Sequence, residues 1–391
     1  MWNAIFRLPS AVWLLGLVSL CNDSASELIY PLVPLYLASV LMATPRALGI
    51  IEGIAEATSG LLKLVSGVIT DRTRTAKPWV LAGYGLAAIA RPLIALAGSW
   101  PMVAVLRFTD RLGKGLRTSP RDAMLARAAP PDRRGLAFGL HRTMDNAGAV
   151  IGPLLAAALL AAHVPLQRIF IWAWVPGALA VSLALAVREP AAEAKPERAR
   201  IDWTLRGFPT VFKRYLATLA LFTLGNASNM FLLLRARDLG LSATQVPLAW
   251  ALVSAVAMVF STPLSALSDR VGRTRMIVTG WLVYGAFYLL LGFNGASQML
   301  LWPLFASYGL YLAATEGAEK SLVADLAPAG QLGTAYGWFN LVTALLLLPA
   351  SILFGWLWQG IGPRAAFGFS ASCALCAALL LSTWVIRPPR S

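Results

Sequence analysis

The sequence predicts an all-α integral membrane protein with twelve transmembrane helices, arranged as two six-helix halves with both termini in the cytoplasm. Three observations predict it: an apolar composition, basic residues gathered in alternate loops, and a repeat that relates the two halves. Of the 391 residues, 58% are hydrophobic and 13% are charged, whereas soluble domains carry roughly 25% charged residues. The composition therefore indicates a protein that lies within a bilayer.

Apolar segments recur along the chain, and each is long enough to supply the roughly 20 residues that a spanning helix needs. The spans that we expect are 11–42, 47–70, 78–98, 101–125, 136–162, 166–187, 209–234, 244–267, 276–294, 298–324, 333–358 and 363–386. The first ten residues carry one positive charge and no clear small-residue cleavage site, so we expect the first span to remain in the mature protein.

Basic residues are concentrated in every second loop. Loops after the even-numbered spans carry Arg72, Arg74, Lys77, Arg127, Arg133, Arg134, Arg188, Lys195, Arg198, Arg200, Arg206, Arg270, Arg273 and Arg275. The opposite loops carry Arg46, Arg168, Arg235, Arg237 and Arg364. By the positive-inside rule, both termini lie in the cytoplasm of a cell with a bacterial-type cytoplasmic membrane. The net charge of +15 follows this alternation, so we do not expect a nucleic-acid partner.

The two halves of the chain repeat. The polar stretch 188–208 is rich in Pro, Glu, Ala and Arg, and we expect it to be a cytoplasmic linker between a bundle at 1–187 and a bundle at 209–391. One offset of 198 residues, without a gap, takes Asp71-Arg72 to Asp269-Arg270 and Ala129-Pro130 to Ala327-Pro328. A parallel duplication of this kind is the architecture of transporters whose halves rock around a central site. It needs no partner subunit, and we expect a monomer.

Two motifs carry a family resemblance. The loop Gly67-Val-Ile-Thr-Asp71-Arg72-Thr-Arg74 resembles the G-x-x-x-D-R-x-G-R/K loop of the major facilitator superfamily, with Arg74 where a Gly is usual. A second copy, Ser265-Ala-Leu-Ser-Asp269-Arg270-Val-Gly272-Arg273, keeps the later Gly and lacks the first. Span five, with Gly139, Gly148 and Gly152-Pro153, is similar to the signature of its proton-coupled antiporter branch, although Ala156-Ala157 replaces the final glycine pair. Arg107 stands where that superfamily has an intramembrane arginine in span four.

The resemblance implies a gating role for the loop and for span five. A charged pair just past a helix end can latch the cytoplasmic face, and small residues let helices approach closely. The gating residues that we expect are Gly67, Asp71, Arg72, Asp269, Arg270, Gly148, Gly152 and Pro153. Simple turns with orienting charges, and ordinary small-residue packing, are the alternatives.

Ionisable residues within the spans are the candidates for coupling chemistry. Asp23 and Glu27 lie at i, i+4 in span one, and Arg107 and Asp110 begin a charged stripe in span four. A charge at membrane depth costs roughly 2.5–3.5 kcal/mol on insertion scales. Because burial favours a neutral carboxyl and a nearby guanidinium favours the charged one, we expect these four residues to carry and tune protons, with Asp23 first. The alternative is a fixed cluster of ion pairs.

Polar and aromatic residues in both halves are the candidates for solute binding, because small-molecule cavities are mainly apolar with a few polar anchors. They are Asn22, Tyr30, Arg107, Arg142, Asp145, Asn226, Asn229, Tyr308, Tyr311, Trp338 and Asn340. Ordinary interfacial aromatics are an equal alternative. We expect Glu52 and Glu56 to lie near the outer surface, His141 to be an interface anchor, and Glu316 and Lys320 to pair at i, i+4.

No enzyme site is predicted. The chain has no phosphate-binding G-x-x-x-x-G-K-S/T motif. His141 and His163 cannot build a metal site by themselves, and Cys21, Cys373 and Cys376 stand in apolar stretches without an activating partner. We therefore expect neither catalysis nor a cofactor or metal.

The sequence thus favours a secondary transporter that works by alternating access and exports a small amphipathic organic solute or drug in exchange for protons. Two alternatives stay open. One is an importer or facilitator of a charged metabolite, with Arg107 and Arg142 as anion anchors. The other is a transporter-like membrane receptor without flux.

Overall fold

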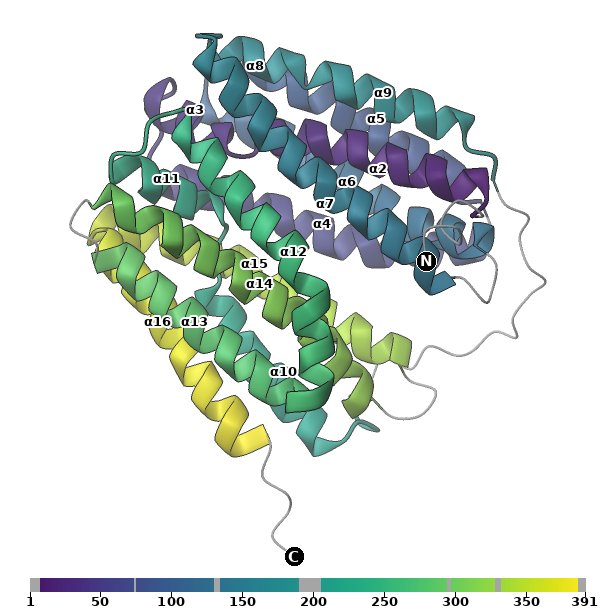
Figure 1. Cartoon of the computed structure of the whole chain (residues 1–391), viewed down its shortest axis with the longest axis vertical. Helices are drawn as coiled ribbons and strands as arrows, with labels where there is room; N and C mark the ends of the chain where they lie inside the picture. The colour runs from purple at the N-terminus through teal and green to yellow at the C-terminus, as the bar shows by residue number, and fades with distance from the viewer. Residues whose placement is uncertain are drawn as a thin grey trace, which may run out of the picture. The chain divides into compact units, whose positions relative to one another are not determined.

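The computed structural model describes residues 8–73, 75–129, 134–189, 205–293, 297–327 and 332–385, and regular structure in these residues is helical (Figure 1). In the first half the helices are α2 (Ser10–Ile29), α3 (Leu32–Ser39), α4 (Pro45–Thr73), α5 (Lys77–Leu93), η1 (Ile94–Leu96), α6 (Trp100–Ala128), α7 (Arg134–Ala161), α8 (Leu166–Trp172) and α9 (Trp174–Ala186). In the second half they are α10 (Thr210–Gly225), α11 (Met230–Asp238), α12 (Gln245–Val271), α13 (Arg273–Phe293), α14 (Gln298–Leu326), α15 (Leu332–Gly360), α16 (Pro363–Leu380) and η3 (Leu381–Val385).

The repeat seen in the sequence extends to the helix boundaries. Shifted by the same 198 residues, α6 at 100–128 falls on α14 at 298–326, and α4 ends where α12 ends. The interruptions coincide too: the break between α2 and α3 falls on the break between α10 and α11. Pro31 explains the first break, because proline lacks the N–H that an uninterrupted helix would use.

The chain forms two compact units that do not follow the two sequence halves strictly. The first unit comprises 1–43, 54–195 and 242–251, and the second comprises 44–53, 196–241 and 252–391. The start of α4 therefore packs in the second unit, and the start of α12 packs in the first.

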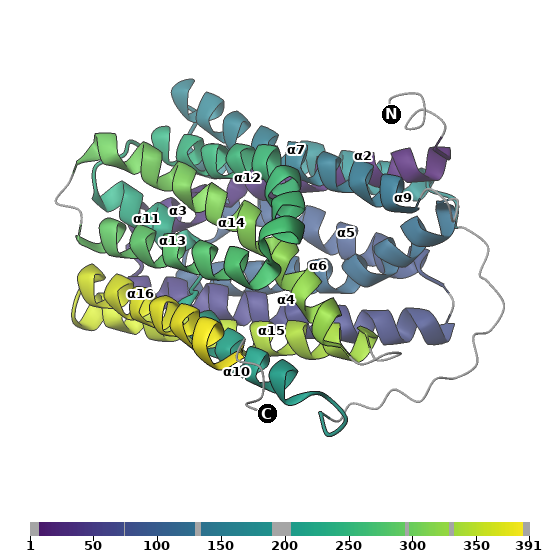
Figure 2. The same ribbon diagram turned by 60° about the horizontal axis from the view of Figure 1, so that its bottom comes forward.

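In the first unit, α2 packs along α7 and α9, and α5 packs along α6 (Figure 1). Apolar side chains fill the space where these helices meet. The buried set includes Val12, Leu15, Val80, Tyr84, Met124, Leu125, Ala137 and Ala184. In the second unit, α13 packs against α14 and α16, and α10 packs against α15 and α16; the α13–α16 pair is visible in Figure 2.

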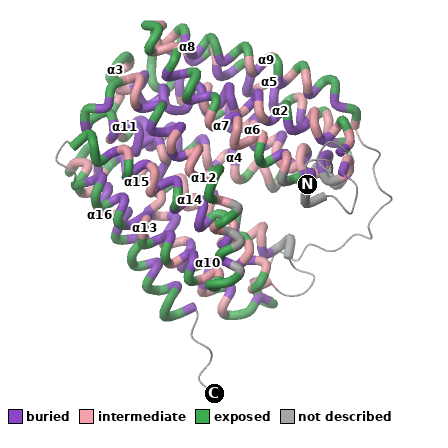
Figure 3. The backbone as a smooth tube through the Cα atoms, in the orientation of Figure 1, coloured by how far each residue is buried: buried purple, intermediate pink, exposed green. Residues whose placement is uncertain are grey.

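Large apolar residues are also exposed on several helices, and Figure 3 marks exposed residues along the backbone in green. On α9, Trp174, Val175, Leu179 and Leu185 are each more than half exposed. An apolar surface of this extent on helices is expected where lipid replaces water. Eight helical stretches in the described residues are long and apolar enough to cross a membrane, which confirms the prediction of an all-α membrane protein.

The eight stretches do not settle the number of spans or the side of the membrane on which the termini lie. Helices α4, α6, α12 and α14 are 27–29 residues long but do not belong to the eight apolar stretches. Twelve spans and cytoplasmic termini remain predictions. The linker at 188–208 falls largely outside the described residues, as do the side chains of Gly67, Asp71, Arg72 and Asp269.

Candidate functional site

A buried trio of charged side chains lies at the centre of the first unit. Asp110 accepts a hydrogen bond from Arg91 Nε at 2.9 Å, and Arg107 Nη1 lies 3.4 Å from its other oxygen. The side chains of Arg91, Arg107 and Asp110 are at most 1% exposed. A charge at this depth is tolerated when it is paired and hydrogen-bonded. The expected Arg107 and Asp110 are thus brought together, with Arg91 as a third member.

Asn22 connects this trio to Asp23. Arg91 Nη1 donates to Asn22 Oδ1 at 3.0 Å and to its carbonyl oxygen at 3.1 Å. Asn22 Nδ2 in turn donates to Asp23 Oδ1 at 2.8 Å. Because the amide oxygen and nitrogen have different partners, the amide has one fixed orientation. A continuous chain of polar contacts therefore runs from Asp23 through Asn22, Arg91 and Asp110 to Arg107.

Glu27, one helical turn beyond Asp23, has an indole as its partner. Trp250 Nε1 donates to Glu27 Oε2 at 2.9 Å, and the Trp250 ring lies 5.3 Å from that of Tyr30. The guanidinium carbon of Arg107 is 6.0 Å from the Tyr30 ring centre. Tyr30 thus lies between Arg107 and the Trp250 ring that binds Glu27. Trp250 belongs to the segment of α12 that packs in the first unit.

The glycines of span five touch α2 beside these two carboxylates. A Cβ at Gly148 would lie 2.6 Å from the Leu20 carbonyl oxygen and 3.0 Å from Asp23 Cβ. A Cβ at Gly152 would lie 2.6 Å from the Leu28 nitrogen and 2.7 Å from the Ser24 carbonyl oxygen. Helix α7 is continuous through Pro153, so the close approach of α7 to α2 within the first unit is what these residues provide.

The charged residues near the start of α7 differ in exposure. His141 is buried rather than placed at an interface, and its Nδ1 lies 3.7 Å from Asp145 Oδ2. Arg142 is exposed. His141 and Asp145 both interact electrostatically with the Asp23 carboxylate.

In the second unit, an unwound segment separates α10 from α11. It holds Asn226 and Asn229, and Asn229 Oδ1 accepts a 2.6 Å hydrogen bond from the Tyr308 hydroxyl. The Ser228 N–H donates to Ser351 Oγ at 3.2 Å. Interrupted spanning helices line solute or ion sites in many transporters, and two of our candidate residues lie in this interruption.

Glu52 supports the same segment. It accepts a 3.2 Å hydrogen bond from Ser228 Oγ, and it is fully buried. The sequence did not predict this burial, and the position of Glu52 near the outer surface stays a prediction. The helix is closely packed at this point, because a Cβ at the neighbouring Gly53 would lie 3.0 Å from the Leu348 carbonyl oxygen.

Aromatic rings surround the remaining candidates of the second unit. Tyr308 and Tyr311 lie 5.4 Å apart, and the Tyr284 ring is 5.0 Å from that of Tyr311. Nearby, Trp281 Nε1 donates to Glu319 Oε1 at 3.0 Å, so this carboxylate has an indole partner as Glu27 does. Trp338 and Asn340 lie on α15, where Asn340 is exposed.

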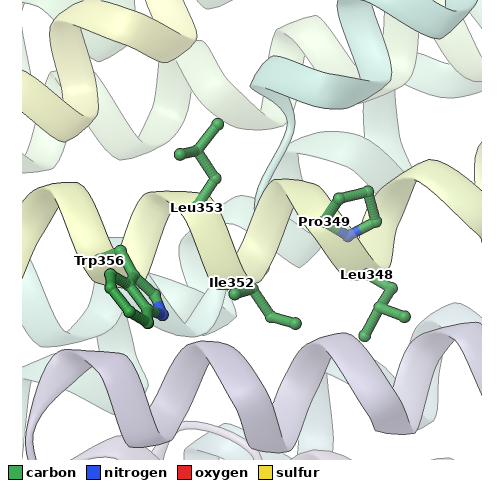
Figure 4. Close-up of a pocket in the computed structure, with 5 residues that line it drawn as sticks. All are labelled: Leu348, Pro349, Ile352, Leu353 and Trp356. Carbon is green, nitrogen blue, oxygen red and sulfur yellow. The ribbon is translucent and has the colours of Figure 1, made fainter.

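A groove of about 510 Å³ lies along α15 (Figure 4). Its lining is apolar and consists of Leu348, Pro349, Ile352, Leu353 and Trp356. It offers no polar anchor and so does not meet the description of a solute site. Within the described residues no group of three or more His, Cys, Asp or Glu side chains has a metal-binding arrangement.

Sequence reasoning missed Arg91, Trp250 and the Glu319–Trp281 contact. Arg91 had a clear signal, because it stands alone in an apolar span and an ionisable residue there is expected to be functional. Trp250 had none: it is 223 residues from Glu27. The predicted pair of Glu316 and Lys320 is confirmed, with 3.4 Å between Oε1 and Nζ.

Comparison with known proteins agrees with this arrangement. Residues 15–234 and 214–391 match the family description "Major Facilitator Superfamily". An uncharacterised MFS-type transporter of Methanocaldococcus jannaschii is 33% identical over 384 residues, covering 96% of this chain and 95% of the relative. The multidrug resistance protein MdtH of Salmonella newport is 26% identical, covering 85% of this chain and 82% of the relative.

Solved structures show the same fold. A POT family transporter bound to a thioalcohol-conjugated peptide has a TM-score of 0.81 at 14% identity, covering 97% of both chains. The nucleoside transporter NupG has a TM-score of 0.81 at 10% identity, covering 96% of this chain and all of the other. The chain belongs to the major facilitator superfamily and is a membrane transporter, not an enzyme.

Proposed function

We propose that this protein is a proton-coupled secondary transporter that exports a small amphipathic organic solute by alternating access. The observation that carries the proposal is the chain of contacts from Asp23 through Asn22, Arg91 and Asp110 to Arg107. We further propose that it works as a monomer in a bacterial-type cytoplasmic membrane.

The partners of the carboxylates divide them into two kinds. Asp110 has the guanidinium groups of Arg91, Arg107 and Arg111 within 4.0 Å, and these three cations favour its charged form. Asp23 and Glu27 accept hydrogen bonds from an amide and an indole. In the described residues neither of these two has an ion-pair partner within 4.0 Å. A carboxylate held by neutral donors can take up a proton without leaving a buried cation unpaired.

Proton uptake at Asp23 would then change the hydrogen bonds along the chain of contacts as far as Arg107. A neutral carboxyl accepts a weaker hydrogen bond than a carboxylate, so protonation loosens the bond from the Asn22 amide. The same amide binds Arg91, which binds Asp110. In this mechanism Asp23 and Glu27 carry protons, while Arg107 and Asp110 respond to them.

The solute contacts and gates remain as the sequence predicts them. Asn22, Tyr30 and Arg107 are close to the proton carriers, and Asn229, Tyr308 and Tyr311 surround the unwound segment of the second unit. Arg142, Asp145, Asn226, Trp338 and Asn340 complete the proposed solute-binding set. Gly148, Gly152 and Pro153 would let α7 move against α2, and Gly67, Asp71, Arg72, Asp269 and Arg270 would form the inner latch.

The similarity to MdtH, a multidrug resistance protein, favours export. Import or facilitated passage of a charged metabolite is the second candidate, because basic side chains in the first unit outnumber the carboxylates that pair with them. Loss of flux altogether would leave the receptor alternative.

Dissipation of an imposed pH gradient tests the proposal. Proteoliposomes with an acidic lumen would be challenged with several hundred metabolites and drugs, and a pH-sensitive dye would report proton efflux caused by each compound. We expect Asp23→Asn to abolish the response and Glu316→Gln, a carboxylate that is 46% exposed, to preserve it. An unchanged response in Asp23→Asn would show that Asp23 is not the carrier, and no response to any compound would favour a receptor.

A further inference from the structure

The crossing of α4 and α6 in the first unit brings two lysines together. Ser119 Oγ donates to the Lys63 carbonyl oxygen at 2.7 Å, and Ser66 Oγ donates to the Gly115 carbonyl oxygen at 2.9 Å. Gly115 permits this contact, since a Cβ there would lie 2.5 Å from Leu62 Cβ. Lys63 and Lys114 therefore extend from the same helix crossing, where their ammonium groups repel each other.

Positive charge exceeds negative charge at this crossing. Arg111 forms an ion pair with Glu56 at 3.0 Å. In the part of the chain that the structure describes, neither Lys63 nor Lys114 has a side-chain hydrogen bond or an ion pair. Glu56 attracts both lysines and Asp23 attracts Lys114, but neither carboxylate lies within 4.0 Å of an ammonium group. Two partly buried ammonium groups are thus left without direct counter-ions.

A neutral group at the same crossing is also unsatisfied. Ser59 is fully buried and its Oγ has no hydrogen-bond partner in the described residues. Glu56, Ser59 and Lys63 follow one another at i, i+3 and i+7, so they share one stripe of α4. Buried polar groups are normally hydrogen-bonded, and an exception points to a partner outside the protein chain.

We propose that Lys63, Lys114 and Arg111 bind the anionic group of the transported solute, with Ser59 as a further hydrogen-bond donor. The ligand is an amphipathic organic anion, carrying a carboxylate, sulfonate or phosphate. This inference rests on the proposed transport function and adds the charge of the solute to it. Glu56 competes with the solute for Arg111, because both present acceptor oxygens to one guanidinium.

The competition makes two opposite predictions. Lys63→Gln and Lys114→Gln each remove a charge-assisted hydrogen bond and are expected to weaken anion binding at least about tenfold. Glu56→Gln removes the competing carboxylate and is expected to tighten it. A side chain with a purely structural role would not give tighter binding on substitution.

The test is the thermal stability of the purified full-length protein in phosphatidylcholine nanodiscs at fixed ionic strength. The probes are 1-naphthoate, 1-naphthyl phosphate, the neutral 1-naphthamide and the cationic 1-naphthylmethylamine. We expect stabilisation by the two anions alone. It should be lost in Lys63→Gln and Lys114→Gln, increased in Glu56→Gln, and unchanged in Lys320→Gln, a lysine that is 56% exposed.

Two results would overturn the inference. One is that the anions stabilise no better than 1-naphthamide, including the case in which no probe binds. The other is that stabilisation occurs only in discs containing phosphatidylglycerol, which would assign the lysines to a lipid headgroup. Because no pH gradient is present, loss of proton coupling in Asp23→Asn leaves this test unaffected.

Discussion

Replacing Arg91 tests whether the buried trio stabilises the first unit. Arg91→Met removes the 2.9 Å contact with Asp110 and two hydrogen bonds to Asn22. Removing one partner of a buried ion pair costs roughly 3–5 kcal/mol. The lower end applies, because Asp110 keeps Arg107 at 3.4 Å. Hydrogen bonds between membrane helices average only about 0.6 kcal/mol, so most of the expected loss of about 3 kcal/mol comes from the counter-charge that Asp110 loses.

The assay is reversible unfolding in mixed detergent and dodecyl sulfate micelles, followed by tryptophan fluorescence. A loss of about 3 kcal/mol raises the unfolding constant about a hundredfold. Arg91→Lys should fall between wild type and Arg91→Met, because one ammonium cannot reproduce the planar fork. Lys320→Met is the control, since an exposed i, i+4 pair contributes roughly 0–1 kcal/mol. If Arg91→Met loses no more than this control, the trio is not a stabilising feature.

Two further predictions concern helix contacts. Gly152→Ala should lower thermal stability and slow transport, because the new methyl meets the backbone of α2 at 2.6–2.7 Å. The control Gly85→Ala, whose new methyl has nothing within 4 Å, should change neither property. Equal behaviour of the two variants would refute a close α2–α7 contact. Tyr308→Phe removes the 2.6 Å bond to Asn229 and should lower the free energy of unfolding by about 0.6 kcal/mol, measured by the same titration. No change would mean that Tyr308 does not hold the unwound segment.

Local patterns were readable from the sequence, and distant contacts were not. The pair of Glu316 and Lys320 was predictable because i, i+4 spacing fixes which side chains meet on one helix. The break at Pro31 carries its own signal, whereas the break at Asn226–Asn229 has no proline. The hydrogen bond from Trp250 to Glu27 depends on the register of helices far apart in the chain, and periodicity within either helix does not determine it.

The same limit explains the burial of Glu52. Its neighbours in sequence suggested a position near the outer surface, because Arg46 lies close by. Burial is decided by a different helix: Ser228 supplies its hydrogen bond, and Leu348 packs beside Gly53. A residue's depth along one helix could be estimated from the sequence, but not which neighbours would cover it.

The repeat places different kinds of side chain at equivalent positions of the two halves. Helices α6 and α14 correspond residue for residue at the 198-residue offset, so Asp110 corresponds to Tyr308. Asp110 is held by ion pairs, whose buried charges tolerate few alternative partners. Tyr308 contacts aromatic rings at 4.8–6.3 Å, and such contacts add only roughly 0.5–1.5 kcal/mol each beyond burial. A side chain held by several weak contacts can repack around different solutes, whereas one in an ion-pair network cannot. In the proposed transporter, the ion pairs of the first unit would serve proton coupling, and the aromatic contacts of the second unit would adapt to different solutes.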